Sequence, residues 1–125
     1  MKVIVADDSQ VMRMIIQKIV GKLGYETIHA NNGQEVLKIL QGEYRNIDLI
    51  LLDWNMPVLN GLETLIRIRE SHPACDIPIL MVSTESEEEK IREAMNAGAG
   101  GYIAKPFTAD TLSEVIRQVK EKRSV

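Results

Sequence analysis

Cysteine and histidine are scarce in this sequence of 125 residues, and their shortage excludes proteins held by internal disulfides or by clustered zinc ligands. The one cysteine, Cys75, cannot form a disulfide within the chain, and with only two histidines it makes no cluster of the kind that binds zinc. No apolar run approaches the roughly 20 residues of a membrane-spanning helix, and the first eight residues hold too short an apolar core for a signal peptide. We therefore expect a cytoplasmic protein without a membrane partner.

Charge of one sign is not in large excess either. The chain has 18 acidic and 15 basic residues, a net charge of −3, which gives no reason to expect binding to nucleic acid or to anionic lipid. Its 45% hydrophobic and 26% charged residues are ordinary for a soluble domain with a single core. We expect one monomeric domain over residues 1–125. The charged tail, residues 120–123, is either a frayed helix end or the start of a linker.

Short apolar runs that stop at acidic or hydroxyl residues predict the strands of a sheet. The central run, Ile47 to Leu52, is too short for a helix, is rich in branched side chains and stops at Asp53, which indicates a strand buried on both faces. Lys2 to Ala6 has the same character and stops at Asp7. Three further strands are predicted at Tyr25 to Ala30, Ile77 to Val82 and Gly101 to Ala104.

Capping residues followed by apolar residues at helical spacing predict five helices. Ser9 is the expected N-cap of the first helix and Gly24 its stop. The next three starts are expected at Asn32 with Glu35, Asn60 with Glu63, and Ser86 with Glu89, and the third and fourth helices should end near His72-Pro73 and Gly98. The expected inner faces are Met12, Ile15, Ile16, Ile19, Val20 and Leu23 in the first helix, Val36, Leu37 and Leu40 in the second, Leu62, Leu65, Ile66 and Ile68 in the third, Ile91, Ala94, Met95 and Ala97 in the fourth, and Leu112, Val115, Ile116 and Val119 in the fifth.

Strands that alternate with helices must pair in parallel, because a parallel neighbour is reached only through a long crossover, which is right-handed. The sequence therefore predicts an α/β fold of the (βα)5 type, with a doubly wound parallel five-stranded sheet and helices on both faces.

The residues able to carry chemistry lie just after the predicted strands. They are Asp7 and Asp8 after the first, Asp53 after the third, Ser83 and Thr84 after the fourth, and Lys105 after the fifth. Carboxyl ends of parallel strands share one edge of the sheet, so we expect these side chains together, on what we call the carboxyl rim. Two carboxylates 4 Å apart repel by about 4 kcal/mol at an effective dielectric constant near 20, so a cation is expected among them. A few oxygen ligands with room for water suit Mg²⁺.

Such a rim is also a setting for phosphoryl transfer to a carboxylate. Mg²⁺ and Lys105 would neutralise the phosphoryl oxygens, and Ser83 would donate a hydrogen bond. Taken singly, each residue has an ordinary structural explanation, as a helix cap or a solvated strand end. Trp54 is equally compatible with packing and with partner contact, and we assign His29, His72 and Cys75 no role beyond structure.

The sequence resembles bacterial two-component response regulator receiver domains along its whole length, and among them the single-domain chemotaxis regulators. The segments that carry the resemblance are Asp7-Asp8, Asp53-Trp54-Asn55-Met56-Pro57 with Asn60-Gly61, Ser83, and Gly101-Tyr102-Ile103-Ala104-Lys105-Pro106-Phe107-Thr108. The resemblance implies a flavodoxin-like strand order 2-1-3-4-5. It also implies a signalling module that assists its own phosphorylation and dephosphorylation and is not otherwise an enzyme.

The resemblance assigns roles to individual residues. Asp53 would accept a phosphoryl group from a histidine kinase or a small phosphodonor, with Lys105 contacting that group. The Mg²⁺ ligands would be Asp8, Asp53 and the backbone carbonyl of Asn55, with Asp7 acting through water. Ser83 and Tyr102 would form the switch pair, and the Lys105-Pro106 peptide bond would be cis.

The resemblance also implies which surface and which partners transmit the signal. The surface of the fourth helix, fifth strand and fifth helix would bind a downstream protein, with the flagellar motor switch as one expected target and a phosphatase as a further partner. Asn55 and Glu85 match positions that modulate hydrolysis of the phosphoryl group. Thr84 departs from the family, which has a small residue there, and would narrow the access of water.

Three alternatives are weighed. The chain could be a phosphorelay intermediate or a receiver domain excised from a larger regulator. An aspartyl-phosphate phosphatase commonly has a second acid two residues after its nucleophile, whereas this chain has Asn55 there. A nucleotide- or flavin-binding protein needs a Gly-rich phosphate loop after the first strand, and Asp7-Asp8-Ser9 is its electrostatic opposite.

Overall fold

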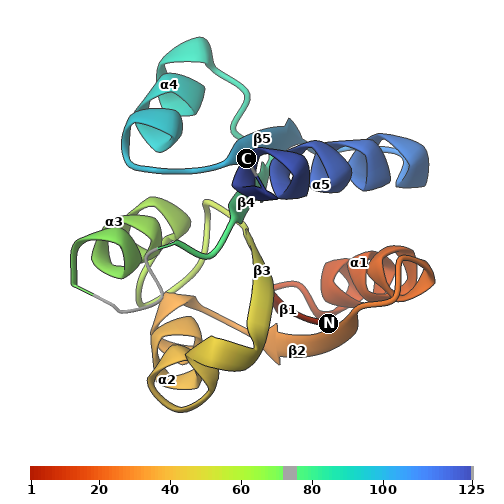
Figure 1. Ribbon diagram of the computed structural model, residues 1–125. Helices are drawn as coiled ribbons and strands as arrows, with labels where there is room; N and C mark the ends of the chain where they lie inside the picture. Colours follow the sequence, from red (N-terminus) through yellow and green to blue (C-terminus); the bar gives the residue numbers. More distant parts are fainter. Residues whose placement is uncertain (72–75, 125) are drawn as a thin grey trace.

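The computed structural model describes residues 1–71 and 76–124, which form one parallel sheet with helices on both sides (Figure 1). The strands are β1 (Lys2–Ala6), β2 (Glu26–Ala30), β3 (Ile47–Leu52), β4 (Ile79–Ser83) and β5 (Gly101–Ala104). The helices are α1 (Gln10–Lys22), α2 (Gly33–Glu43), α3 (Gly61–Ser71), α4 (Glu88–Asn96) and α5 (Ala109–Ser124), with a 3₁₀ turn at Tyr44–Asn46. The strand order is β2-β1-β3-β4-β5, with every pair parallel. The predicted (βα)5 fold is confirmed.

Two hydrophobic cores lie on opposite faces of the sheet. Alternate residues of β3 point to opposite sides, so Ile50 and Leu52 join the core under α2, α3 and α4, while Leu49 and Leu51 join the core under α1 and α5. Figure 1 shows these two sets of helices on the two sides of the sheet. Burial of each such side chain contributes about 1.5 to 3 kcal/mol, so β3 is a rigid support for the residues at its carboxyl end.

Local capping explains where most helices begin. The Ser9 hydroxyl accepts a hydrogen bond from the Met12 backbone N–H at 3.2 Å, as predicted for the start of α1. Asn60 and Glu63 exchange the two bonds of a capping box, and Asn32 accepts from the backbone N–H of Glu35 at 2.9 Å. Gly24 ends α1 with φ of +92°, a conformation that glycine adopts without strain.

The predicted start of the fourth helix is wrong. The N-cap of α4 is Glu87, without a side-chain capping bond, rather than Ser86. Both backbone polar groups of Glu85 are held, because its N–H donates to the Ser83 hydroxyl and its carbonyl accepts from the Tyr102 hydroxyl. The chain therefore continues as a loop past Ser86 before the helix begins. Two of the four expected inner residues are half-buried, Ala94 is buried, and Met95 is 40% exposed.

Two strand boundaries also differ from the predictions. β4 begins after Pro78, which has no N–H to give to the ladder, and extends through Ser83, which pairs with Ala104. β2 begins at Glu26 because the Tyr25 N–H instead bonds to the Val20 carbonyl at 3.1 Å.

The inner face of α1 is the predicted one only in part, since Ile16 and Val20 are buried and Met12 and Ile19 pack against the same core, but two predicted residues do not. Ile15 and Leu23 are 44% and 38% exposed, whereas Arg13 is buried beside Ile16 and Val20. The charged tail is helical as far as Ser124. The expected end of the third helix at His72-Pro73, and Cys75, lie outside the described residues.

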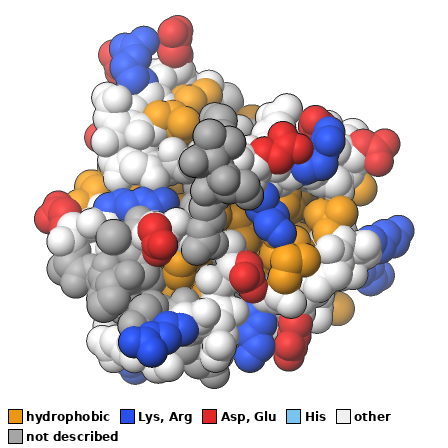
Figure 2. All heavy atoms as spheres, viewed as in Figure 1, with side chains coloured by type: hydrophobic (Ala, Val, Ile, Leu, Met, Phe, Trp, Pro, Cys, Tyr) orange, Lys and Arg blue, Asp and Glu red, His pale blue; other side chains and the backbone are white. Residues whose placement is uncertain are grey.

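Charged groups are mixed on the surface. Figure 2 shows Lys and Arg interspersed with Asp and Glu on the face in view. Within residues 1–71 and 76–124, no helix is both long enough and apolar enough to span a membrane.

Candidate functional site

Three carboxylates meet at the ends of two neighbouring strands. Asp7 and Asp8 follow β1 and Asp53 follows β3, and the Asp53 N–H bonds to the Ala6 carbonyl at 2.9 Å, which brings the strand ends together. One carboxylate oxygen from each of the three lies within 4.8 Å of the other two. Asp7 and Asp53 are 2% and 7% exposed, while Asp8 is open to solvent. The sequence prediction of an acidic group on the carboxyl rim is thus matched by the geometry.

Lys105 lies against two of these carboxylates. Its Nζ is 2.6 Å from Asp7 Oδ2 and 3.5 Å from Asp53 Oδ2, and the lysine side chain is 11% exposed. The peptide bond that comes after it, Lys105-Pro106, is cis, as the resemblance implied. One ammonium group in contact with two of the three carboxylates leaves an excess of negative charge. Carboxylates at the 4.8 Å limit repel by about 3 to 4 kcal/mol at an effective dielectric constant of 20.

Burial raises the pKa of the Asp53 carboxyl above its ordinary value, and the charge of Asp7 adds to this rise. The nearby Lys105 ammonium and a hydrogen bond with the backbone of Asn55 act in the opposite direction. The charged form of Asp53 is therefore under-compensated by the protein itself. A cation bound on the rim would compensate the negative charge of Asp53.

The rim fits a hard divalent cation. Its donors are carboxylate oxygens from Asp7, Asp8 and Asp53, which suit Mg²⁺, and the exposure of Asp8 leaves room for water ligands. The described residues thus supply a group compatible with metal binding. The participation of the Asn55 carbonyl stays a prediction.

Ser83 and Tyr102 both bind the backbone of one residue, Glu85. Ser83 is fully buried at the end of β4, and its hydroxyl accepts from the Glu85 N–H at 3.2 Å. The half-buried Tyr102 of β5 donates its hydroxyl hydrogen to the Glu85 carbonyl, and burial raises the pKa of its phenol. The two residues predicted as a switch pair are therefore linked at Glu85, in the loop that leads into α4.

The residues expected to modulate hydrolysis also come together. The side-chain amide of Asn55, two residues after Asp53, donates to Glu85 Oε1 at 3.3 Å. Thr84, between Ser83 and Glu85, is exposed.

Trp54, directly after Asp53, is a packing residue. It is 6% exposed and belongs to the core under α2, α3 and α4. The ammonium of Lys90 on α4 lies 5.0 Å from the centre of its ring, at the distance of a cation–π contact. Trp54 thus connects the segment that carries Asp53 to α4.

Two residues near the rim were given no individual role from the sequence. Arg13 is buried, and its Nη1 donates to the carbonyl oxygen of Asp7 at 2.6 Å. The signal for it was its spacing from Ile16 and Val20, which places all three on one face of the helix. Gly61 packs so closely on Asp53 that a Cβ there would overlap the Asp53 carbonyl oxygen, and no sequence pattern indicates that contact.

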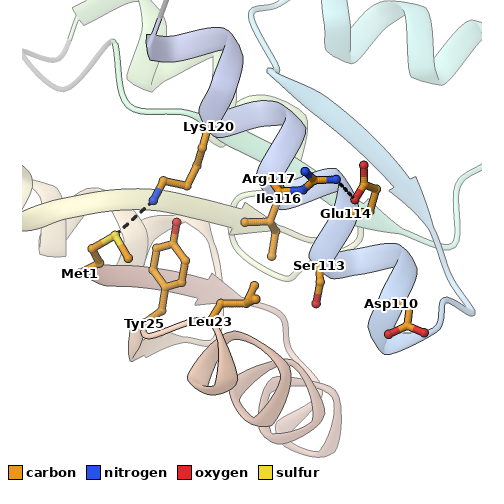
Figure 3. Close-up of a pocket in the computed structure, with 9 residues that line it drawn as sticks. All are labelled: Met1, Leu23, Tyr25, Asp110, Ser113, Glu114, Ile116, Arg117 and Lys120. Carbon is orange, nitrogen blue, oxygen red and sulfur yellow. Dashed lines mark hydrogen bonds and ion pairs between the residues drawn. The ribbon is translucent and has the colours of Figure 1, made fainter.

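A separate hollow of about 460 Å³ lies between the segment that follows α1 and the length of α5 (Figure 3). It is lined by Met1, Leu23, Tyr25, Asp110, Ser113, Glu114, Ile116, Arg117 and Lys120. None of the predicted site residues lines it, so the hollow is not part of the rim.

Comparison with known proteins agrees with this geometry. The family model described as "Response regulator receiver domain" matches residues 3–117. The chain is 37% identical over 123 residues to the chemotaxis protein CheY of Pseudomonas aeruginosa, covering 98% of each chain. It is 38% identical over 124 residues to CheY-3 of Vibrio cholerae, covering 98% of this chain and 93% of that one.

Solved structures give the same result. The response regulator CheY4 of Vibrio cholerae superposes with a TM-score of 0.86 at 36% identity, covering 94% of this chain and 97% of that one. A response regulator receiver domain from Clostridium thermocellum gives 0.87 at 27% identity, covering 98% and 96%. With its acidic rim, its lysine and its five-stranded order, this chain belongs to the response regulator receiver domain family.

Proposed function

We propose that the chain is switched on by transfer of a phosphoryl group from the phosphohistidine of a histidine kinase to Asp53. One observation carries this proposal. The buried Asp53 carboxylate lies between two further carboxylates and a lysine whose Nζ is 3.5 Å away, and its charge is not balanced within the protein. This is the environment that a carboxylate nucleophile and its charged product both require.

In the transfer, a bond forms between an Asp53 carboxylate oxygen and phosphorus. The bond between phosphorus and the histidine nitrogen breaks, and the leaving imidazole takes up a proton. Asp8, Asp53, the Asn55 carbonyl and, through water, Asp7 would hold Mg²⁺, which when bound supplies positive charge to the phosphoryl oxygens. Lys105 supplies a second positive charge, since small shifts of its flexible chain bring Nζ from Asp7 to an oxygen on Asp53.

The switch follows from the contacts of Glu85. A phosphoryl group on Asp53 offers the Ser83 hydroxyl a charged acceptor, and turning toward it weakens the bond that Ser83 accepts from the Glu85 N–H. The carbonyl of the same residue accepts from Tyr102, so a movement of the Glu85 backbone transmits the state of Ser83 to the Tyr102 ring and to α4. We propose the α4, β5 and α5 surface as the output face on this basis.

The lifetime of the phosphoryl group is set, on this proposal, by Asn55, Glu85 and Thr84, the residues that follow Asp53 and Ser83. Water must pass these three side chains to attack phosphorus. The contact between Asn55 and Glu85 orders two of them.

Chemotaxis is the pathway that the relatives favour, since two of them carry that word in their names and share almost their whole length with this chain. We propose on this support that the downstream partner is a component of the flagellar motor switch. The alternative function of an aspartyl-phosphate phosphatase has no comparable support, because Asn55 occupies the position where such enzymes commonly have their second acid.

The test is phosphoryl uptake from acetyl phosphate, followed by intact-protein mass spectrometry. We expect one phosphoryl group on the wild type in the presence of Mg²⁺ and none after chelation. Asp53→Asn should abolish uptake, whereas Asp110→Asn, an exposed acid in the first turn of α5, should leave it unchanged. Undiminished uptake by Asp53→Asn would refute the assignment.

A further inference from the structure

A buried arginine lies behind the acidic rim. Arg13 is in the first turn of α1 and is 9% exposed, on the same face as the buried Ile16 and Val20. A charged side chain is costly to remove from water unless polar partners compensate it. The polar partners of Arg13 therefore explain how its positive charge is tolerated at this buried position.

Arg13 joins three elements of the fold. Its Nη1 donates to the carbonyl oxygen of Asp7 at the end of β1, at 2.6 Å, and its Nε donates to Nδ1 of His29 on β2, at 3.2 Å. Because Nδ1 accepts this bond, the ring hydrogen is on Nε2, which lies 3.1 Å from Oε1 of Gln17 on α1 and can donate to it. His29 thus fixes the direction of the guanidinium, and Gln17 fixes the ring of His29.

The Asp7 residue is held at each of its polar groups. Its N–H donates to the Ala30 carbonyl at 3.1 Å, and its two carboxylate oxygens accept from the Ser9 N–H and the Lys105 ammonium at 2.9 and 2.6 Å. Its carbonyl oxygen is held by Arg13. That carbonyl belongs to the planar peptide that joins Asp7 to Asp8, so its direction determines the direction in which Asp8 leaves the strand.

We propose that Arg13 and His29 form a positioning pair that orients the Asp7–Asp8 peptide and so sets the affinity of the rim for a divalent cation. The inference deepens the proposed function, on which it rests, and assigns this affinity partly to two residues that touch neither metal nor phosphoryl group. His29, given no role from the sequence, acts through Arg13.

A positioning role and a purely electrostatic role of Arg13 predict opposite changes in Mg²⁺ affinity when the side chain is removed. A positive charge near the rim repels a divalent cation, so if Arg13 acted only through its charge, its removal would tighten Mg²⁺ binding. If it orients the peptide, its removal loosens binding, because Asp8 is no longer presented toward Asp53. The sign of the change therefore separates the two roles.

The experiment measures Mg²⁺ affinity by isothermal titration calorimetry with magnesium chloride alone. We expect Arg13→Met to raise Kd by about tenfold or more, the usual effect of losing a residue that orients a metal ligand. The matched control is Arg117→Met, which removes an exposed arginine of α5 and should leave Kd unchanged. Melting temperatures without Mg²⁺ report any general loss of stability separately.

A second pair of variants tests His29 while leaving the charge of Arg13 in place. His29→Asn keeps an acceptor oxygen at the position of Nδ1 and should retain the wild-type Kd. His29→Leu removes the acceptor and should raise Kd, by a smaller factor than Arg13→Met. Because His29 is exposed, this pair is informative even if Arg13→Met does not fold.

The outcomes distinguish failure of this inference from failure of the proposed function on which it rests. If the wild type does not bind Mg²⁺, the proposed function fails and the inference with it. If the wild type binds and Arg13→Met binds equally well or more tightly, only the inference is overturned. Equal Kd values for His29→Leu and His29→Asn would likewise remove His29 from the pair.

Discussion

Replacement of Gly61 by alanine tests how tightly the backbone at Asp53 is constrained. Gly61 is the first residue of α3, and its N–H donates to the Trp54 carbonyl at 2.9 Å. A Cβ at this position would overlap the Asp53 carbonyl oxygen, and would lie 2.9 Å from the Asp53 carbonyl carbon and 3.0 Å from the Met81 terminal methyl. The methyl of methionine can move aside, but the backbone of Asp53 is anchored to a buried strand and yields only with strain.

The expected change in the stability of Gly61→Ala is the difference between two opposed effects. Overpacking of this kind costs about 1 to 3 kcal/mol, and the better helix propensity of alanine returns at most about 1 kcal/mol. The middle of the overpacking range, about 2 kcal/mol, less this gain leaves a net loss of about 1 to 2 kcal/mol, which corresponds to a melting temperature lower by roughly 4 to 8 °C for a domain of this size. Displacement of the nucleophile should also slow phosphorylation by acetyl phosphate, by up to about a hundredfold for a shift near 1 Å.

The matched control is Gly21→Ala, the same chemical change within α1, where a Cβ has nothing within 4 Å. We expect it to stabilise the protein by about 0.5 to 1 kcal/mol and to leave the phosphorylation rate unchanged. Thermal unfolding by circular dichroism and a timed acetyl phosphate reaction measure both quantities. A Gly61→Ala protein with the stability and the rate of the wild type would refute the proposed constraint.

Three further predictions concern the rim. Burial raises the pKa of Asp53 in the folded protein, so the wild type loses stability as pH rises from the ordinary Asp value of about 3.9 through the folded value. Urea unfolding without Mg²⁺ should therefore show Asp53→Asn more stable than the wild type at neutral pH, with a gain that shrinks in acid; a gain that grows in acid would contradict this. Mg²⁺ at a hundredfold excess over its Kd should stabilise the wild type by about 2.7 kcal/mol, and Asp8→Asn less, whereas a melting temperature indifferent to Mg²⁺ would exclude the metal site. Ser83→Ala should still be phosphorylated but should lose the NMR shift of Tyr102 and of residues 84–98 that beryllofluoride, a phosphoryl mimic, induces in the wild type, and retention of the full shift would remove Ser83 from the switch.

The fold was predictable because its signals are local. Each buried strand is an apolar run with a polar stop, and Ser9, Asn32 and Asn60 mark helix starts through bonds to residues three positions away. The rim residues were predictable for the same reason, since parallel strands place their ends at one edge.

Features that depend on contacts between distant segments were missed from the sequence. The start of α4 was misplaced because Tyr102, 17 residues beyond Glu85, holds the Glu85 carbonyl. Arg13 was overlooked because a lone arginine in an apolar stripe gains its meaning from the Asp7 carbonyl and from His29 on another strand. The closeness of Gly61 to Asp53 depends on how α3 packs against the end of β3, which composition does not encode.

Phosphorylation of Asp53 is the central claim, and borohydride trapping tests it most directly. Borohydride reduces an aspartyl phosphate to homoserine, which peptide mass spectrometry locates. After reaction with acetyl phosphate and Mg²⁺, we expect homoserine at position 53 and unmodified aspartate at positions 7 and 8. Homoserine at position 7 or 8, or a stable phosphate on Ser83 with position 53 unmodified, would contradict the claim.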